Sequence, residues 1–600
     1  MNQQKYSVNQ HLIETIVNWV KSGEIAIPEI QRPFVWSATQ VRDLMDSLYQ
    51  GYPVGYIIAW RNPNVRLKDG TISEGKRVLI DGQQRVTALT AAILGQKVIN
   101  KDYKKVNIQI AFNPIEERFE VSNSAIKKDK KWIDNISPII TNETRLSKVV
   151  REYCELNEGV DDGKIEDVLE NLKAIVKKQI GLIELSGDLD IERVTEIFIR
   201  INSKGVELSQ ADFVMSKIAS NEAYGGNLLR KCIDYFSHLA IAPEFYSSIE
   251  DLDKEFVKTE YFPKVSWLKN ENDDLYDPSY KDVLRVAFIY KFARGRLKDL
   301  VSLLSGRNFE TREYIEEISE NTYKGLNDGV LAYINETNFK RFVMIIKSAG
   351  FIHKKLIRSK NALNFAYVVY LKLKEQKYKP ALIEKYVKKW FIMSILTGRY
   401  SGSPESVFDF DIKNIDTKDF GEYLKEVETA RLSDAYWSAE LVQRLNTSVS
   451  SSPAFNVFLA AQSKFNDKGF LSKDITIKDL IEQRGDVHHI FPRAYLKQHK
   501  LQRGQYNQVA NYVYTQSEIN IQIGMKAPSQ YFTELKEQCN DGMNNLKYGA
   551  ISNMNDLLDN MKQNCIPTSI FEMDIEQYND FIAERRILIA KKIRAYYETI

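Results

Sequence analysis

Cysteine is scarce in this chain, and its scarcity excludes two classes of protein. The four cysteines are scattered and form no CxxC pair, which argues against a disulfide framework and against a structural zinc cluster. No apolar run reaches the length of about 18 residues that a membrane helix needs, and the N-terminus MNQQKYSVNQ lacks the apolar centre of a signal peptide. We therefore expect a protein of the reducing cytoplasm without a membrane partner.

A strong excess of charge is also missing. The net charge is only +3 at pH 7, so any nucleic-acid site must be a local basic surface rather than a property of the whole chain. A Walker A sequence is absent as well, which excludes a P-loop ATPase.

The length of the chain indicates several domains. Its 600 residues exceed what one hydrophobic core accommodates, since a domain typically has about 150 residues. The motifs and helical patterns described below predict an N-terminal α+β part (1–215), a helical connector (216–400) and a C-terminal helical part (401–600). The predicted fold class is therefore multi-domain and mainly α, with α+β structure at both ends.

The N-terminal part begins with a predicted helix and an extended segment. Apolar residues of segment 7–22 recur at helical spacing and predict an amphipathic helix. Segment 25–37, IAIPEIQRPFVWS, is the first of three sequence motifs that we call boxes. It carries two prolines and is expected to be extended and to lead into a turn. Ser37 is expected to cap a helix that Gly51 ends, and a strand is expected at 53–60.

A second box has the sequence RVLIDGQQRVTALTAAILG. Residues 77–80 predict a buried strand, Asp81 and Gly82 a sharp turn, and residues 84–94 a helix. Such a turn presents backbone N–H groups and the positive end of a helix dipole, an arrangement that suits phosphate.

The side chains of this box supply further groups for an anion. Arg85 offers a guanidinium group to phosphate, Asp81 a carboxylate that can hold a metal or polarise water, and Gln83 and Gln84 neutral hydrogen bonds. An ion pair between Arg85 and Asp81 on a solvated turn is the competing interpretation.

A third box, residues 193–213, predicts two helices joined by a turn. The first helix is expected to stop at Asn202-Ser-Lys-Gly205 and the second to start at Ser209. By itself this segment predicts only a connection between helices.

Together the three boxes carry a resemblance to a known family. IPEIQRPFVW, LIDGQQRVTAL and FIRINSKGVELS resemble the N-terminal domain of GmrSD-like modification-dependent restriction endonucleases over roughly residues 8–215. The resemblance implies a ParB/sulfiredoxin-like fold and a nucleotide-binding and hydrolysing Asp-Gly-Gln-Gln-Arg motif, complete here from Asp81 to Arg85. It also implies that Gln31 and Arg32 join Arg85 around the phosphates and that Asn202 closes the site.

The middle of the chain has helical periodicity. Apolar residues at three- and four-residue spacing predict helices at 281–306, 338–350, 361–376 and 381–398, with solvated basic faces. The sequence RYSGSPES, residues 399–406, interrupts the pattern and predicts a hinge.

The strongest chemical signal lies between residues 486 and 520. Three of the chain's six histidines fall in this window: His488, His489 and His499. A strand-like approach, a basic loop, a second β-rich run from Asn511 and a helix follow one another. Thr515 and Glu518 have the spacing of a capping box and predict the start of that helix.

This window resembles the HNH, or ββα-metal, nuclease motif found at the C-terminus of the same family. Phosphodiester hydrolysis needs a general base and a divalent cation. The resemblance implies that His489 is the base, that Asn511 holds the loop and orients the histidine, and that His488 and Asn520 bind the metal.

The first metal position departs from the family pattern, because it is commonly acidic and here is His488. An imidazole ligand tolerates Mn²⁺, Co²⁺, Ni²⁺ or Zn²⁺ better than Mg²⁺. Asp486, two residues earlier on the same expected strand face, is a candidate for the missing carboxylate. A structural pair of hydrogen-bonded histidines is the competing interpretation.

Basic residues near the histidines are candidates for DNA binding. Their charges and their place beside the expected base suit contacts with phosphate groups. These residues are Arg493, Lys497, Lys500, Arg503 and, beyond the helix, Lys526. The C-terminal FIAERRILIAKKIRAYYETI is expected to be a helix that covers the C-terminal core.

Because both ends resemble parts of one family, the leading expectation is a nucleotide-regulated, metal-dependent DNA endonuclease of a bacterial anti-phage restriction system. The resemblance implies foreign, modified double-stranded DNA as substrate, Mg²⁺ or Mn²⁺, and a nucleoside triphosphate of unspecified identity that the N-terminal domain hydrolyses. One active site per chain favours nicking, so a double-strand break would need a homodimer. The competing expectations are a nucleotide-switched DNA-binding regulator that does not cleave and an HNH ribonuclease.

Overall fold

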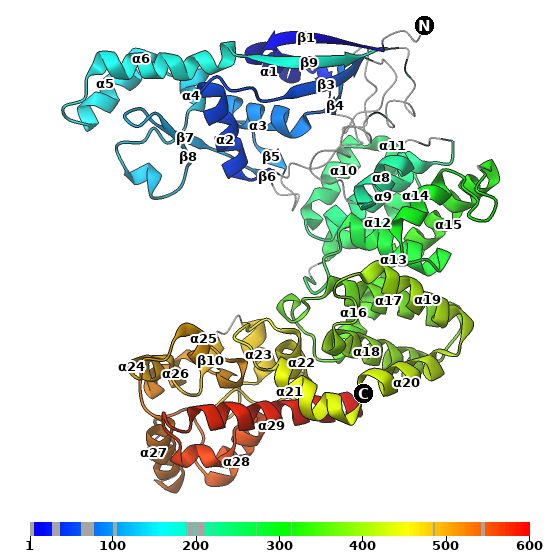
Figure 1. The fold of residues 1–600 in the computed structure, drawn as a ribbon, viewed down its shortest axis with the longest axis vertical. Coiled ribbons are helices and arrows are strands. Elements are labelled where there is room, and N and C mark those ends of the chain that lie inside the picture. Colours follow the sequence, from blue (N-terminus) through cyan, green and yellow to red (C-terminus); the bar gives the residue numbers. More distant parts are fainter. Residues whose placement is uncertain are drawn as a thin grey trace. The chain divides into compact units, whose positions relative to one another are not determined.

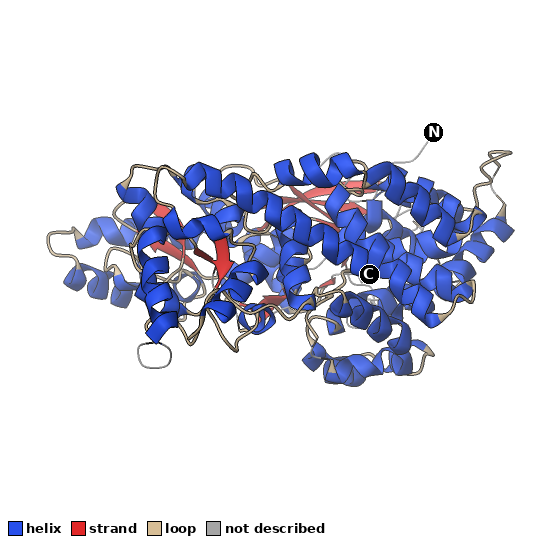
Figure 2. Cartoon of the chain, turned by 90° about the horizontal axis from the view of Figure 1, so that it is seen from below, coloured by secondary structure: helices blue, strands red, loops and turns tan. Residues whose placement is uncertain are grey.

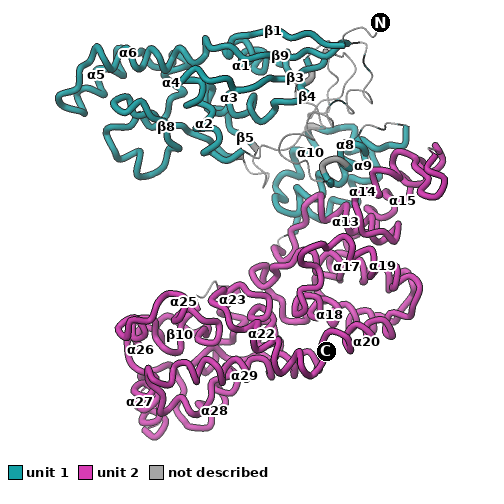
Figure 3. Tube along the Cα trace, viewed as in Figure 1, with its two compact units in different colours: residues 1–271 teal, residues 272–600 magenta. Residues whose placement is uncertain are grey.

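The computed structural model describes residues 5–26, 36–61, 77–99, 105–187, 189, 197, 210–219, 221, 223–271, 273–313, 315–483, 487–541 and 546–600. The chain divides into two compact units, Met1–Glu271 and Asn272–Ile600 (Figure 3). Helices predominate in the chain, as Figure 2 shows, and together with the two units this confirms a multi-domain, mainly α protein. The three-part division at residues 215 and 400 and the ParB/sulfiredoxin-like assignment remain predictions.

The first unit is built on a mixed five-stranded sheet of order β1-β9-β3-β4-β2 (Figure 1). β1 is antiparallel to β9, β9 is parallel to β3, β3 is antiparallel to β4, and β4 is parallel to β2. The strands span Tyr6–Leu12 (β1), Ile25–Ala26 (β2), Tyr56–Arg61 (β3), Arg77–Asp81 (β4) and Gln179–Leu185 (β9).

Helices α1 (Ile13–Lys21), α2 (Ala38–Tyr49) and α3 (Gln83–Leu94) bury apolar residues with this sheet in one core. Ile16, Met45, Leu79 and Leu89 belong to that core and are almost fully buried. These three helices alternate along the chain with the first strands of the sheet. The unit also contains α5 (Leu146–Leu156), α6 (Asp162–Lys173), α8 (Gln210–Ala219), α9 (Gly226–Leu239) and a hairpin of β7 (Ile110–Asn113) and β8 (Arg118–Val121).

The helix predicted over 7–22 is wrong in its first half. Residues 6–12 form β1, which pairs along its whole length with β9, and α1 begins only at Ile13. Pairing with a strand far along the chain outweighs the local helical pattern, because strand formation depends on neighbours in the sheet.

The predicted cap at Ser37 is confirmed. Its hydroxyl accepts from the Gln40 backbone N–H at 3.2 Å, and the Gln40 side chain accepts from the Ser37 N–H at 2.9 Å. This reciprocal capping box starts α2.

The second unit is a helical assembly that contains one short two-stranded sheet. The four predicted helical segments are confirmed, although 281–306 forms two helices. They are α13 (Tyr280–Phe292), α14 (Leu297–Leu304), α16 (Glu336–Ser348), α17 (Lys360–Glu375) and α18 (Pro380–Thr397). Between α13 and α14 the backbone of Gly295 lies against Glu405 and Asp409, so close that a side chain there would clash.

Residues 399–403 form the turn between α18 and α19 (Pro404–Thr417), and Arg399 and Asp411 form an ion pair beside it. The C-terminal helix, α29 (Tyr578–Thr599), buries Phe581, Ile589 and Ile593, as expected of a helix that covers a core. The hydroxyl of Tyr596 on α29 donates to the Ala349 carbonyl just after α16, so the end of the chain packs on the middle helices. Among the described residues, no helix is both long and apolar enough to cross a membrane.

Candidate functional sites

The first candidate site is the turn from β4 into α3. β4 ends at Asp81, Gly82 adopts the left-handed conformation with φ +88°, and α3 begins at Gln83. A β-carbon on Gly82 would lie 3.3 Å from the Ile57 Cα, so the tight turn requires glycine. The first N–H groups of a helix have no acceptor within the helix, so this turn is a place where an anion can bind.

The Arg85 guanidinium is folded back against the turn. It donates to the Tyr56 carbonyl at the start of β3. It also packs against Gly55 and Gly82, so closely that a β-carbon on either glycine would lie 3.4 Å from it. No ion pair joins Arg85 to Asp81 in the part of the chain that the structure describes, so the competing interpretation of a simple ion pair finds no support. A guanidinium has five N–H donors, and the others suit a phosphate.

The described residues on either side of segment 27–35, Ala26 and Trp36, contact β4 and α3. β2 runs parallel to β4 and pairs Ala26 with Val78, and the Trp36 N–H donates to the Gln84 side-chain oxygen at 3.3 Å. The predicted phosphate ligands Gln31 and Arg32 belong to this segment and, like Asn202, lie outside the described residues.

The second candidate site is a two-stranded antiparallel sheet followed by a helix. β10 (Val487–His489) pairs with β11 (Tyr512–Tyr514), and α26 (Ser517–Ile523) follows and carries Asn520. The two strands and the helix follow one another in the order expected from the sequence. Apolar residues around it form one core, which includes Ile490, Phe491, Val513, Ile519 and Tyr531.

The predicted capping box of the last helix is wrong. α26 begins at Ser517 with Gln516 as its N-cap, and neither side chain of the predicted pair caps it. The Thr515 hydroxyl instead donates to the Phe470 carbonyl at 2.6 Å, because Thr515 is buried against that neighbouring segment.

His489 is half-buried and held by two neighbours. Its Nε2 lies 3.0 Å from the Asn507 side-chain oxygen, and its ring stands edge-on to the ring of Tyr512, its partner across the sheet. Because an amide oxygen only accepts, this bond places the proton on Nε2 and leaves the lone pair on Nδ1. Burial lowers the His489 pKa below its ordinary value. The hydrogen bond to Asn507 opposes this shift, and the charges of Arg493 and His488 add to it, so the net direction favours the neutral ring.

Asn511 holds the backbone that follows His489. It is fully buried, its side-chain oxygen accepts from the Phe491 N–H at 2.8 Å, and its amide donates to the carbonyls of Phe491 at 3.1 Å and Tyr506 at 3.3 Å. Its own carbonyl accepts from the Ile490 N–H at 2.9 Å. This geometry matches the loop-holding role that the resemblance implies.

His488 pairs with Val513, and successive side chains of a strand point to opposite faces, so His488 and His489 do not share a face of β10. Separate roles as ligand and base fit this arrangement better than joint chelation. The two predicted metal ligands lie on different elements, His488 on β10 and Asn520 on α26, and their role as ligands stays a prediction. Asp486 lies outside the described residues, and no group of three His, Cys, Asp or Glu side chains forms a metal cluster within the described part.

The basic segment between the strands is helical rather than a loop. Arg493 and Lys497 lie on α24 (Arg493–Gln498), Lys500 follows it, and Arg503 starts α25 (Arg503–Tyr506). All are exposed, and the cations of Arg493 and Lys497 lie 5.6 and 5.9 Å from the centre of the Tyr506 ring.

Lys526 differs from these four residues. Its ammonium group donates to Glu534 at 2.8 Å and to the Tyr548 hydroxyl, and Lys547 pairs with the same carboxylate. Its ammonium group is therefore already engaged within the protein, although it shares the single Glu534 carboxylate with Lys547, and this engagement weakens its candidacy as a DNA ligand.

Sequence reasoning missed several residues that hold this site. Asn507 binds His489, the Tyr531 hydroxyl donates to the Ile490 carbonyl at 2.9 Å, and the Tyr578 hydroxyl donates to the Gln505 carbonyl at 2.8 Å. Tyr531 lies on α27 (Pro528–Asp541) and Tyr578 on α29, and no local sequence pattern predicts their contacts with this site.

Two comparisons with known proteins bear on these sites. Residues 13–219 match the family described as the GmrSD restriction endonuclease N-terminal domain, a stretch that includes the whole β4–α3 turn. The chain is also similar over nearly its full length to the uncharacterized protein MJ0686 of Methanocaldococcus jannaschii. The two are 22% identical, and the alignment spans 97% of this chain and 98% of that protein.

Proposed function

Residues 13–219 belong to the family of GmrSD restriction endonuclease N-terminal domains, and from this premise we propose that the chain is a nucleotide-regulated, divalent-metal-dependent DNA endonuclease. The family name supports a nuclease with DNA as its substrate. We further propose that cleavage takes place at the β10–β11–α26 site and that the nucleotide binds at the β4–α3 turn.

The observation that carries this proposal is the state of His489. A general base must be unprotonated at working pH and oriented toward its substrate. Burial favours the neutral form of His489, and its bond to Asn507 fixes which nitrogen carries the lone pair. A histidine with a purely structural role would not need exposed cations beside it, whereas phosphate binding uses Arg493 and Lys497.

In the proposed reaction, Nδ1 of His489 takes a proton from the attacking water while Asn507 holds the Nε2–H. The exposed cations of α24 and α25 bind the flanking phosphates and position the scissile one. His488 and Asn520 would hold the divalent cation, which when bound offsets charge on the phosphate and the leaving oxygen. Asn511 keeps the Phe491 backbone in place and thereby fixes where β10 ends.

At the other site, the N–H groups at the start of α3 and the Arg85 guanidinium would bind nucleotide phosphates. Gly82 lets the phosphate approach the backbone, and Asp81 at the end of β4 would hold a cation or polarise water for hydrolysis. We propose that the bound nucleotide activates or inhibits cleavage. This coupling would be refuted if the cleavage rate changed neither on addition of nucleotide nor in the Arg85→Ala variant.

A nicking assay on plasmid DNA tests the nuclease. Wild-type protein with Mg²⁺ or Mn²⁺ is expected to nick, EDTA to abolish nicking, and His489→Ala to lower the rate by about 10²-fold or more. His499→Ala is the matched control, because His499 is exposed at the end of α24 and should leave nicking unchanged. Equal nicking by wild type and His489→Ala, or none by either, would favour a non-cleaving regulator.

The same assay defines the substrate. Matched modified and unmodified phage DNAs, each with and without ATP or GTP, show whether foreign modified DNA is preferred. RNA of the same sequence shows whether the chain is a ribonuclease instead. Linear product that rises with the square of protein concentration would indicate that a homodimer makes double-strand breaks.

A further inference from the structure

Arg585 on α29 is a buried cation without a carboxylate partner among the described residues. Only 1% of it is exposed, and burial lowers its pKa to about 10. Its guanidinium donates only to backbone carbonyls: Nη1 to Ala510 and Tyr512, both at 2.8 Å, and Nη2 and Nε to Asn564 at 3.0 and 3.3 Å. Burying a charge without an opposite charge beside it costs free energy. Here the hydrogen bonds to these carbonyls offset that cost.

The carbonyls that Arg585 binds flank a residue of the candidate site. Ala510 and Tyr512 stand on either side of Asn511, whose side chain clamps Phe491. The Tyr512 ring also packs edge-on against His489. One guanidinium therefore fixes the backbone on both sides of Asn511 and the start of the strand that packs on the histidine.

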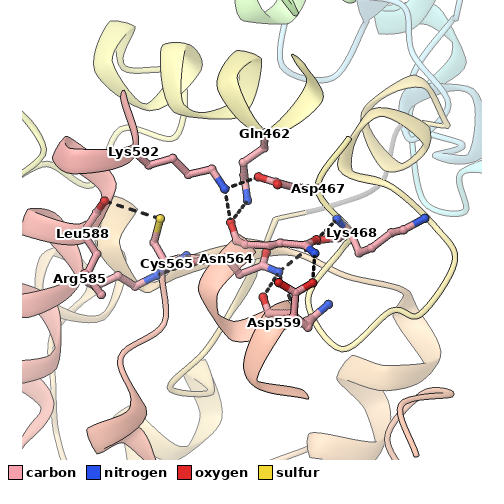
Figure 4. A network of polar contacts seen from close by, with 11 residues as sticks. Gln462, Asp467, Lys468, Asp559, Asn564, Cys565, Arg585, Leu588 and Lys592 are labelled. Carbon is pink, nitrogen blue, oxygen red and sulfur yellow. Dashed lines mark hydrogen bonds and ion pairs between the residues drawn. The ribbon is translucent and has the colours of Figure 1, made fainter. Parts of the chain in front are cut away.

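The other end of the guanidinium donates to Asn564, which belongs to a network of hydrogen bonds. The Asn564 side chain donates to the carbonyls of Lys468 at 3.1 Å and Asn560 at 2.9 Å (Figure 4). In the same network, Lys592 of α29 pairs with Asp467 and donates to the Gln563 carbonyl at 2.7 Å. Arg585 thus connects this network directly to the backbone of the candidate site.

We propose that Arg585 is a positioning residue for His489. It acts through the Ala510 and Tyr512 carbonyls, because its planar fork reaches both of these and Asn564 at once. An ammonium group cannot span that set in the same geometry. The inference rests on the proposed role of His489 as the base, although its structural half can be tested without any cleavage.

Two substitutions in the full chain test it. Arg585→Lys keeps the charge, and Arg585→Met keeps much of the shape without charge or donors, a change that buried ionic sites often tolerate in folding. Tyr596→Phe is the control, because it removes a buried α29 hydroxyl that donates to Ala349, away from the candidate site. Circular dichroism and thermal unfolding compare the folding of all variants.

Two readouts follow. In hydrogen-exchange measurements, both Arg585 variants are expected to speed amide exchange in peptides covering 487–491 and 510–514, because the carbonyls of Ala510 and Tyr512 lose the guanidinium that holds them. In nicking assays, kcat should fall in the order wild type, lysine, methionine, by about 10-fold or more for methionine, with little change in KM. Tyr596→Phe should change neither readout.

A folded Arg585→Met protein with wild-type exchange at 487–491 and wild-type kcat would overturn the positioning role. If Arg585→Met does not fold, a wild-type result for folded Arg585→Lys in both readouts would do the same. If the wild type cleaves nothing, the proposed nuclease function fails, while hydrogen exchange still decides whether Arg585 holds the segment that carries His489.

Discussion

Replacing Asn511 with alanine removes the side chain that joins the end of β10 to the segment before β11. Asn511 is 0% exposed, and its amide makes bonds to the Phe491 N–H, the Phe491 carbonyl and the Tyr506 carbonyl. Alanine would leave these backbone groups buried without their partner. The β10–β11 connection should therefore loosen.

The size of the effect follows from the bonds lost. A buried hydrogen bond contributes about 1 kcal/mol net, and a buried polar group left without a partner costs about 1–3 kcal/mol. Three lost bonds at about 1 kcal/mol each predict that Asn511→Ala lowers the free energy of unfolding of the second unit by about 3 kcal/mol or more. Nicking should fall as well, because His489 immediately precedes the released backbone.

The chain offers a close control for this experiment. Asn560 is 3% exposed and makes the same pattern of bonds, accepting from the Leu471 N–H and donating to the carbonyls of Gly469 and Ser472. Asn560→Ala should cost a similar amount of stability while it leaves the bonds between Asn511 and Phe491 in place.

Urea unfolding measures the stability of both variants, and hydrogen exchange of peptides covering 487–496 reports local opening. Asn511→Ala should speed exchange at Phe491 far more than Asn560→Ala does. The reasoning is refuted if Asn511→Ala costs less than about 1 kcal/mol, or if both variants leave exchange at 487–496 equally protected.

Three further changes have defined outcomes. Gly82→Ala should destabilise the first unit by about 1–3 kcal/mol in urea unfolding, because its φ of +88° is left-handed and Ile57 crowds the new methyl group. Arg493→Gln removes a charge that lowers the His489 pKa, so the acid limb of the kcat/KM profile, where activity is lost by protonation, should move to higher pH. Lys497→Ala should weaken DNA binding and reduce the slope of log K against log salt by about 0.9, since one phosphate contact is lost.

Matched variants separate the causes. Gly159→Ala has a similar φ of +83° but open space around it, so it should cost less than the Gly82 change, and an equal cost would contradict the crowding argument. Lys500→Gln should leave the acid limb in place, and a shift equal to that of Arg493→Gln would point to a general effect of surface charge. Lys526→Ala should leave the salt slope unchanged, because Glu534 already pairs with that ammonium, and a change equal to that of Lys497→Ala would show that Lys526 binds DNA.

Local rules were enough to predict the features that depend on a few neighbouring residues. The Gly82 turn is one, because only glycine adopts its backbone angle at no cost, and the Ser37 capping box is another. The helices of the second unit follow from apolar spacing in the same way. The order of β10, β11 and α26 was also readable from the sequence, whereas the role of Asn511 was implied by the family resemblance and stays a prediction.

Tertiary structure alone decided the features that depend on distant partners. Residues 6–12 form a strand because β9 pairs with them, and Thr515 leaves the predicted cap because the Phe470 carbonyl accepts its hydroxyl. The role of Arg585 is likewise invisible in sequence, since its acceptors are carbonyls that every residue possesses. A buried polar group needs a partner wherever the fold provides one, and the residue letters do not record which carbonyl that will be.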